Sequence, residues 1–242
     1  MKNWIVLTKE EIKLIMIIME KTVLPDIAEI DETFSPRDDI VKEMLKKGFF
    51  EETGDGRKLI SFVHFVMWNV INADCVLHSR GKDASICNIY FKSDVMILLS
   101  KKADSDSFVF HFTPYIPQAI GGFSYYYEQL TNFVTGKNEA EIKEIYVENE
   151  LKKVDDLLHA LCENGIYEAN KEQIAFSLQG DVFDKPVFFG VLLKTFDRWL
   201  FAQAEDKVIT YSGVDGFGML KKISEWIIAT HGSCVSWGMN NE

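Results

Sequence analysis

The sequence contains few cysteines, few prolines and too few basic residues to balance its acidic ones. Its 242 residues include 4 Cys and 5 Pro, and 26 Lys and Arg residues stand against 37 Asp and Glu residues, for a net charge of −11. With 47% hydrophobic residues and so little proline, the chain is an ordered globular protein and neither disordered nor collagen-like. The cysteines share no CxxC spacing and lie among apolar residues, which predicts buried free thiols: Cys75, Cys87, Cys162 and Cys234.

The sequence also lacks a long hydrophobic run. The most apolar stretch near the N-terminus, Leu14 to Met19, has six residues, whereas a helix that spans a bilayer needs about 20. Charged residues precede this stretch, and no small-residue cleavage site follows it. We therefore expect a cytoplasmic protein that is not inserted in a membrane.

Motifs that mark common catalytic sites are missing. The chain has no GxSxG, HExxH or GxxxxGK[ST] motif and no GxGxxG motif after a strand. Asp155 and His159 are spaced for one helix face, but two ligands do not complete a metal site. His111 shows no oriented acidic partner in the sequence. The expectation is a protein without catalytic activity, metal or cofactor, and the alternative is an enzyme whose site is assembled from distant residues.

Helix signals dominate the first part of the chain and the start of the second. Thr8 and Glu11 form a capping-box pattern that begins a helix to about Lys21. A second helix is expected from Ser35-Pro36 to Lys47, where Gly48 ends it. Further helices are expected over residues 59–79, up to about Val134, within 139–163 before Gly165, and over 219–230.

Two groups of three strands follow the helical segments. Both groups are rich in β-branched and aromatic residues, and polar turns separate the strands: 86–92, 95–100 and 107–113 in the first group, and 187–194, 198–204 and 207–212 in the second. Three strands alone are weakly stable, whereas two such groups can bury one common core. The sequence therefore predicts an α+β fold with one mainly antiparallel sheet of about six strands, flanked by helices.

The two halves of the chain share a local pattern. The segment from Ile40 to Glu51 aligns with the segment from Leu157 to Glu168: the apolar positions match, and two large hydrophobic residues follow each glycine. The order of the following strands also matches. We therefore predict an internal duplication, with a first half-repeat at 1–134 and a second at 135–242, joined near Thr135–Asn138 into one globular unit.

Aromatic residues are the strongest candidates for a protein-binding surface. Consecutive aromatics beside Gly121-Gly122 cannot all face one core, and the second half has a surplus of them. The candidate partner-binding residues are Phe123, Tyr125, Tyr126, Trp199, Phe201, Tyr211 and Phe217. The competing interpretation places the same side chains in the hydrophobic core.

A winged-helix DNA-binding protein is a second possibility. Between Pro36 and Ile60 a helix, a glycine, hydrophobic residues and an Asp-Gly turn with Arg57-Lys58 are arranged like a recognition helix and wing. The charge of this segment argues against nucleic acid as a partner, because six basic residues are balanced by six acidic ones.

The overall layout resembles the EspG family, the cytosolic substrate chaperones of type VII secretion systems, or a Firmicute relative of that family. The similarity lies in the duplicated halves, the opening Val23-Leu24-Pro25 followed by the helix–glycine segment Ile40 to Phe50, the long helix and the strand meander. The resemblance implies a chaperone or adaptor without enzymatic activity. Such a protein would bind the hydrophobic tip of secreted helical proteins and keep them soluble until export.

Overall fold

A computed structural model describes most of the chain. The described residues are 3–24, 27–30, 33–54, 56–81, 83–131, 142–168, 173–180, 188–194, 199–214 and 216–241. Within them the chain forms six helices, one large antiparallel sheet and two small hairpins.

The large sheet contains ten strands, and every neighbouring pair is antiparallel. Their order is β1 (Trp4–Thr8), β9 (Ser107–Phe112), β8 (Val95–Lys101), β7 (Ile86–Lys92), β6 (Cys75–Gly81), β11 (Gln173–Gly180), β12 (Phe188–Lys194), β13 (Trp199–Glu205), β14 (Val208–Val214) and β10 (Lys143–Tyr146). The mixed helix and antiparallel-sheet class is confirmed. The expectation of about six strands was too low, because the two central strands, β6 and β11, and the two edge strands, β1 and β10, were not predicted.

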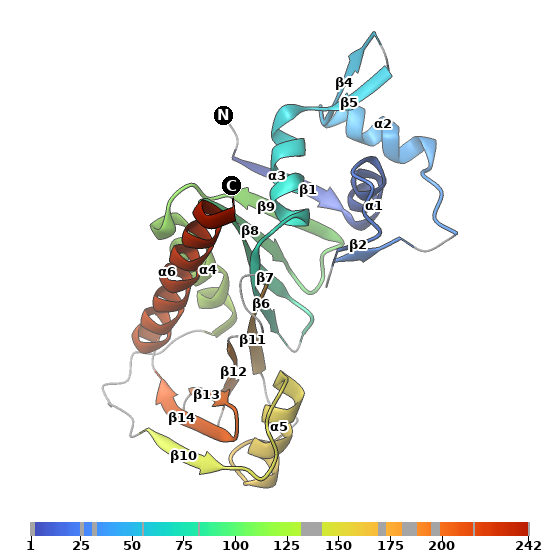
Figure 1. Ribbon diagram of the computed structural model, residues 1–242. Helices are drawn as coiled ribbons and strands as arrows, with labels where there is room; N and C mark the ends of the chain where they lie inside the picture. Colours follow the sequence, from blue (N-terminus) through green and yellow to red (C-terminus); the bar gives the residue numbers. More distant parts are fainter. Residues whose placement is uncertain are drawn as a thin grey trace.

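Helices cover both faces of this sheet (Figure 1). They are α1 (Lys9–Ile18), α2 (Asp38–Lys46), α3 (Ser61–Ile71), α4 (Ile116–Thr131), α5 (Val154–Glu163) and α6 (Gly216–Asn241). The hairpins are β2 (Val23–Leu24) with β3 (Ala28–Glu29), and β4 (Phe50–Thr53) with β5 (Gly56–Leu59). No helix within the described residues is long and apolar enough to cross a membrane.

Three hydrophobic clusters hold these layers together. One cluster packs α1, α2 and α3 on the first strands of the sheet, and a second packs α5 on β12 and β13. The third lies on the opposite face, where α4 and α6 cover the central strands and meet side chains from both halves, such as Phe91 and Phe176. Residues from the N-terminal and C-terminal parts of the chain therefore share this cluster.

Several element boundaries differ from those predicted. The helix expected over 59–79 ends at Ile71, and Cys75–Gly81 forms β6, because Asn72 ends the helix and the next side chains alternate between the two faces. The second helix begins at Asp38, two residues after Pro36. Residues 143–146, expected within a helix, form edge strand β10, whereas the closing helix, expected over 219–230, runs from Gly216 to Asn241.

The capping box at Thr8 and the glycine helix ends at Gly48 and Gly165 are confirmed. The Thr8 side chain accepts a hydrogen bond from the Glu11 N–H, and Glu11 Oε2 accepts one from the Thr8 N–H at 2.8 Å. Gly48 and Gly165 have positive φ angles of 71° and 68°, and the next residue in each case donates to a carbonyl five residues back. The aligned segments therefore end their helices in the same way.

The order of elements is also similar in the two halves. In each half an edge strand pairs with the last strand of a four-stranded meander, and a helix follows that meander, with β1, β6–β9 and α4 in one half and β10, β11–β14 and α6 in the other. The duplication and the domain boundary stay predictions, and the link at Thr135–Asn138 lies outside the described residues.

Candidate functional site: a groove beside helix α4

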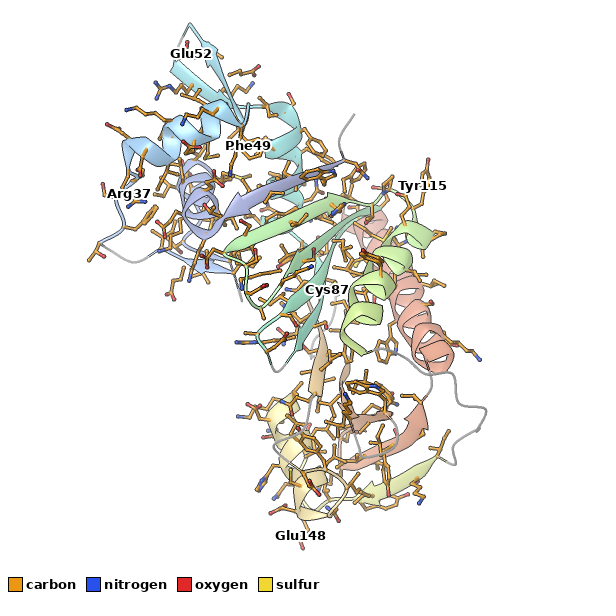
Figure 2. The ribbon with its side chains drawn as sticks, turned by 180° about the vertical axis from the view of Figure 1, so that it is seen from behind. Arg37, Phe49, Glu52, Cys87, Tyr115 and Glu148 are labelled. Atoms are coloured by element: carbon orange, nitrogen blue, oxygen red, sulfur yellow. The ribbon has the colours of Figure 1, made fainter. Side chains whose placement is uncertain are left out.

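A groove of about 620 Å³ lies between α4 and the outer strands of the sheet. Its floor is formed by side chains of β8 and β9, and its wall is formed by α4. The described lining residues are Asn3, Leu98, Ser100, Lys102, Ser105, Ser107, Val109, His111, Thr113, Gln118, Gly121, Gly122 and Tyr125. Figure 2 shows this region, with β1 and β9 in view and α4 standing to one side of them.

Strand alternation explains which side chains form the floor. In β9, Phe108 and Phe110 point into the cluster beneath α1 to α3, so Val109 and His111 face the groove. In the neighbouring β1, Ile5 and Leu7 enter the same cluster. Trp4 therefore lies on the groove side of the sheet, next to His111, with 6.4 Å between their ring centroids.

Two adjacent glycines of α4, Gly121 and Gly122, line the groove. A Cβ atom at Gly122 would lie 2.6 Å from Leu98 Cδ2, so this glycine lets the helix pack closely on β8. A Cβ atom at Gly121 would meet no atom of the described structure within 4 Å. Packing within the described chain therefore accounts for Gly122 but gives no reason for Gly121, although glycine weakens a helix interior.

Exposed aromatic side chains surround this corner of the molecule. Tyr125 is 64% exposed, Tyr115 is 65% exposed and Trp4 is 38% exposed. Tyr115 precedes α4 at the end of β9, where Figure 2 labels it. Phe65 of α3 is also exposed and meets Phe112 of β9 on the other face, with 5.3 Å between ring centroids. Exposed aromatic residues in one region are typical of protein-binding surfaces.

The groove carries little charge although the chain is acidic. Lys102 is the one charged side chain among its described lining residues. Burial lowers the pKa of His111 from its ordinary value of 6.5, so the imidazole is neutral at physiological pH. The described lining is therefore neutral to weakly basic, in contrast to the net charge of −11.

The aromatic residues that the sequence analysis selected lie in different environments in the structure. Phe123 is buried because it points from α4 to the sheet, two residues before exposed Tyr125. Trp199 and Phe201 share one strand face, as predicted, but α6 covers that face, and the Trp226 ring lies 5.6 Å from that of Phe201. These three side chains belong to the core, which was the competing interpretation.

The other members of the set lie in different places. Tyr125 lines the groove, and Tyr211 is partly buried against the α5 cluster, on the other face of the sheet. The side chains of Tyr126 and Phe217 lie outside the description. Of the residues predicted to bind a partner, the structure therefore brings Tyr125 to the groove.

Sequence reasoning missed Trp4, Tyr115 and His111 as members of this region. Trp4 begins a run of β-branched and leucine residues that ends at the helix cap Thr8. This composition favours a strand and could have indicated β1. No local pattern indicates that this strand pairs with β9, because about 100 residues separate the two strands.

The competing functions find less support in the geometry. In the β4–β5 hairpin, Glu51 pairs with Lys58 and Glu52 with Arg57, so the cations of the predicted wing lie opposite acidic residues. Neither His111 nor His159 shares a cavity with a carboxylate among the described lining residues. His159 instead pairs with Glu163 on the exposed face of α5, at 3.2 Å.

Comparisons with known proteins point to one fold. No family model matches the sequence, and no curated protein matches it. A solved structure, that of the Mycobacterium tuberculosis type VII secretion system chaperone EspG5 in complex with the PE25–PPE41 dimer, superposes with a TM-score of 0.64. The similarity covers 93% of this chain and 95% of that chain, at 8% sequence identity. At this identity the similarity shows a shared fold, and it supports the predicted resemblance at the level of the fold.

Proposed function

We propose that the protein is a chaperone or adaptor without enzymatic activity that binds secreted helical proteins of a type VII-like system in the cytosol and keeps them soluble. The main support is the extent of the structural similarity to EspG5, which covers nearly the whole of both chains. That chaperone was solved in complex with the PE25–PPE41 dimer.

The groove beside α4 supplies a surface suited to this role. Its floor contains the apolar residues Leu98 and Val109 beside two serines and His111, and exposed aromatic side chains lie near it at Trp4 and Tyr125. Covering each large apolar side chain of a client would contribute about 1.5–3 kcal/mol before ordering costs. The acidic remainder of the surface would keep the loaded complex soluble.

Co-expression with small helical proteins encoded beside this gene tests the proposal. Each candidate is produced alone and together with this chain, and its soluble fraction and complex are measured by size-exclusion chromatography and native mass spectrometry. We expect at least one candidate to be insoluble or aggregated alone and to form a defined complex with this chain. Candidates that stay soluble alone and form no complex at micromolar concentrations would refute the chaperone role.

A further inference from the structure

Among the described residues, helices cover only part of the groove face of the sheet. The main strand contacts of α6 are with β6, β7 and β14, and those of α4 are with β7 and β8. The groove lies beyond α4, over β9 and toward edge strand β1. Two neighbouring strands together are about 10 Å wide, and the axes of two packed helices are usually 8–10 Å apart. The part of this face that the described helices leave uncovered is therefore about one helix wide.

We propose that this groove binds one amphipathic helix of a partner protein, which lies beside α4 as a third helix of that layer. The inference rests on the proposed function, because it names the part of a helical client that the chain recognises. A six-residue strand such as β9 extends over about 20 Å, and a helix of about 13 residues has that length.

Gly121 is the observation that favours a helix packed directly on α4. Alanine at this position would stabilise α4 and would meet nothing within 4 Å in the described structure. A bare backbone at this point lets another helix approach closely. The partner helix should therefore place a small residue, alanine, serine or glycine, against Gly121, because a larger one would force the two helices apart.

The flanking side chains define the rest of the partner helix. Val109 and Leu98 are the apolar residues of the floor, which also contains Ser100 and Ser107, and Trp4 and Tyr125 lie at its sides. Apolar residues spaced three and four apart would contact this floor. Lys102 lies at the β8–β9 turn, so the partner helix should carry an acidic residue at that end.

Two fluorescein-labelled peptides of about 18 residues test the inference. Both carry a leucine stripe at helical spacing and glutamates in the first turn, and they differ in one central stripe residue, which is alanine in one and leucine in the other. Binding is measured by fluorescence anisotropy to the full-length protein and to two variants, Gly121→Leu and Gly232→Leu. Gly232 is the matched control: it is an exposed glycine of α6, outside the groove lining, where a Cβ atom also meets nothing within 4 Å.

We expect the alanine peptide to bind the wild type more tightly than the leucine peptide. Gly121→Leu should weaken its binding about tenfold or more, and Gly232→Leu should leave it unchanged. Equal binding to all three proteins, or no saturable binding of either peptide, would overturn the inference.

The co-expression experiment separates this inference from the proposed function. A native complex that forms equally well with Gly121→Leu would overturn the groove as the helix site and leave the chaperone role standing. Peptide binding that depends on Gly121, without any complex among the co-expressed candidates, would support the groove and count against the chaperone role.

Discussion

Among single residues, Glu11 connects the first helix of the chain to the second. Its carboxylate is buried, accepts the Thr8 N–H, and contacts Lys47 Nζ with both oxygens at 2.7 Å. Replacing Lys47 by methionine leaves a buried carboxylate with fewer partners, so the free energy of unfolding should fall by about 2 kcal/mol. Urea titration followed by circular dichroism measures this change.

Lys46 provides the control for that substitution. It pairs with Glu43 on the surface, where the lysine side chain is 71% exposed, against 35% for Lys47. Lys46→Met should change the stability by less than about 0.5 kcal/mol. If both variants lose the same stability, the buried pair does not hold α1 to α2.

His111 makes stability depend on pH. Burial lowers its pKa below 6.5, so the unfolded chain binds a proton at this site more readily than the folded chain does. This destabilising contribution is absent well above pH 6.5 and develops as the pH falls through and below that value. Urea titrations at about pH 7.5 and pH 5.5 should therefore show a smaller loss of stability in His111→Gln than in the wild type. An identical loss in both proteins would contradict the assignment.

Strands β6 and β11 pair at the centre of the sheet, where the first and second parts of the chain meet. Gly180 lies opposite Cys75, and a Cβ atom there would lie 2.3 Å from the Asp74 carbonyl oxygen and 2.5 Å from Cys75 Cα. These are backbone atoms, so Gly180→Ala must push the two strands apart and should cost about 1–3 kcal/mol. Thermal unfolding compares it with Gly54→Ala, which meets nothing within 4 Å and should be close to neutral. A neutral Gly180→Ala would show that the halves are not joined at this contact.

The sequence predicts best those elements whose ends are determined by residues close to them in the chain. The capping box at Thr8 and the glycines at positions 48 and 165 act through neighbouring atoms, so their patterns located helix ends correctly. The strands from β7 to β9 are dense in β-branched and aromatic residues. In contrast, β6 follows a helix after three residues and contains His78, Ser79 and Arg80, so its composition resembles a polar helix end more than a central strand.

The groove was harder to predict because it forms between distant segments. The sequence analysis selected Phe123, Tyr125 and Tyr126 together. Which of these side chains reaches the groove depends on the orientation of α4, and packing of the helix against Leu98 decides that orientation. Trp199 and Phe201 were correctly placed on one face, and only the position of α6 shows that this face is covered. Alternation within a strand does not reveal which face a distant helix will cover.

At the scale of the whole molecule, the ten-stranded sheet has two different ends. The β1 end carries the groove, exposed Trp4 and an uncharged edge strand, whereas edge strand β10 contains Lys143 and Glu144 together with exposed Tyr146. Charged residues on an edge strand discourage pairing with a strand of another chain, so such pairing is less favoured at β10 than at β1. The similarity of the two halves in element order therefore does not extend to their surfaces.

Hydrogen exchange of the chain, alone and in complex with a co-expressed helical client, tests the central claim most directly. We predict slower exchange in α4 around residues 116–125 and in β9, with no change in β10 or α5. Protection confined to β10 and α5, with α4 and β9 unchanged in a stable complex, would contradict the account.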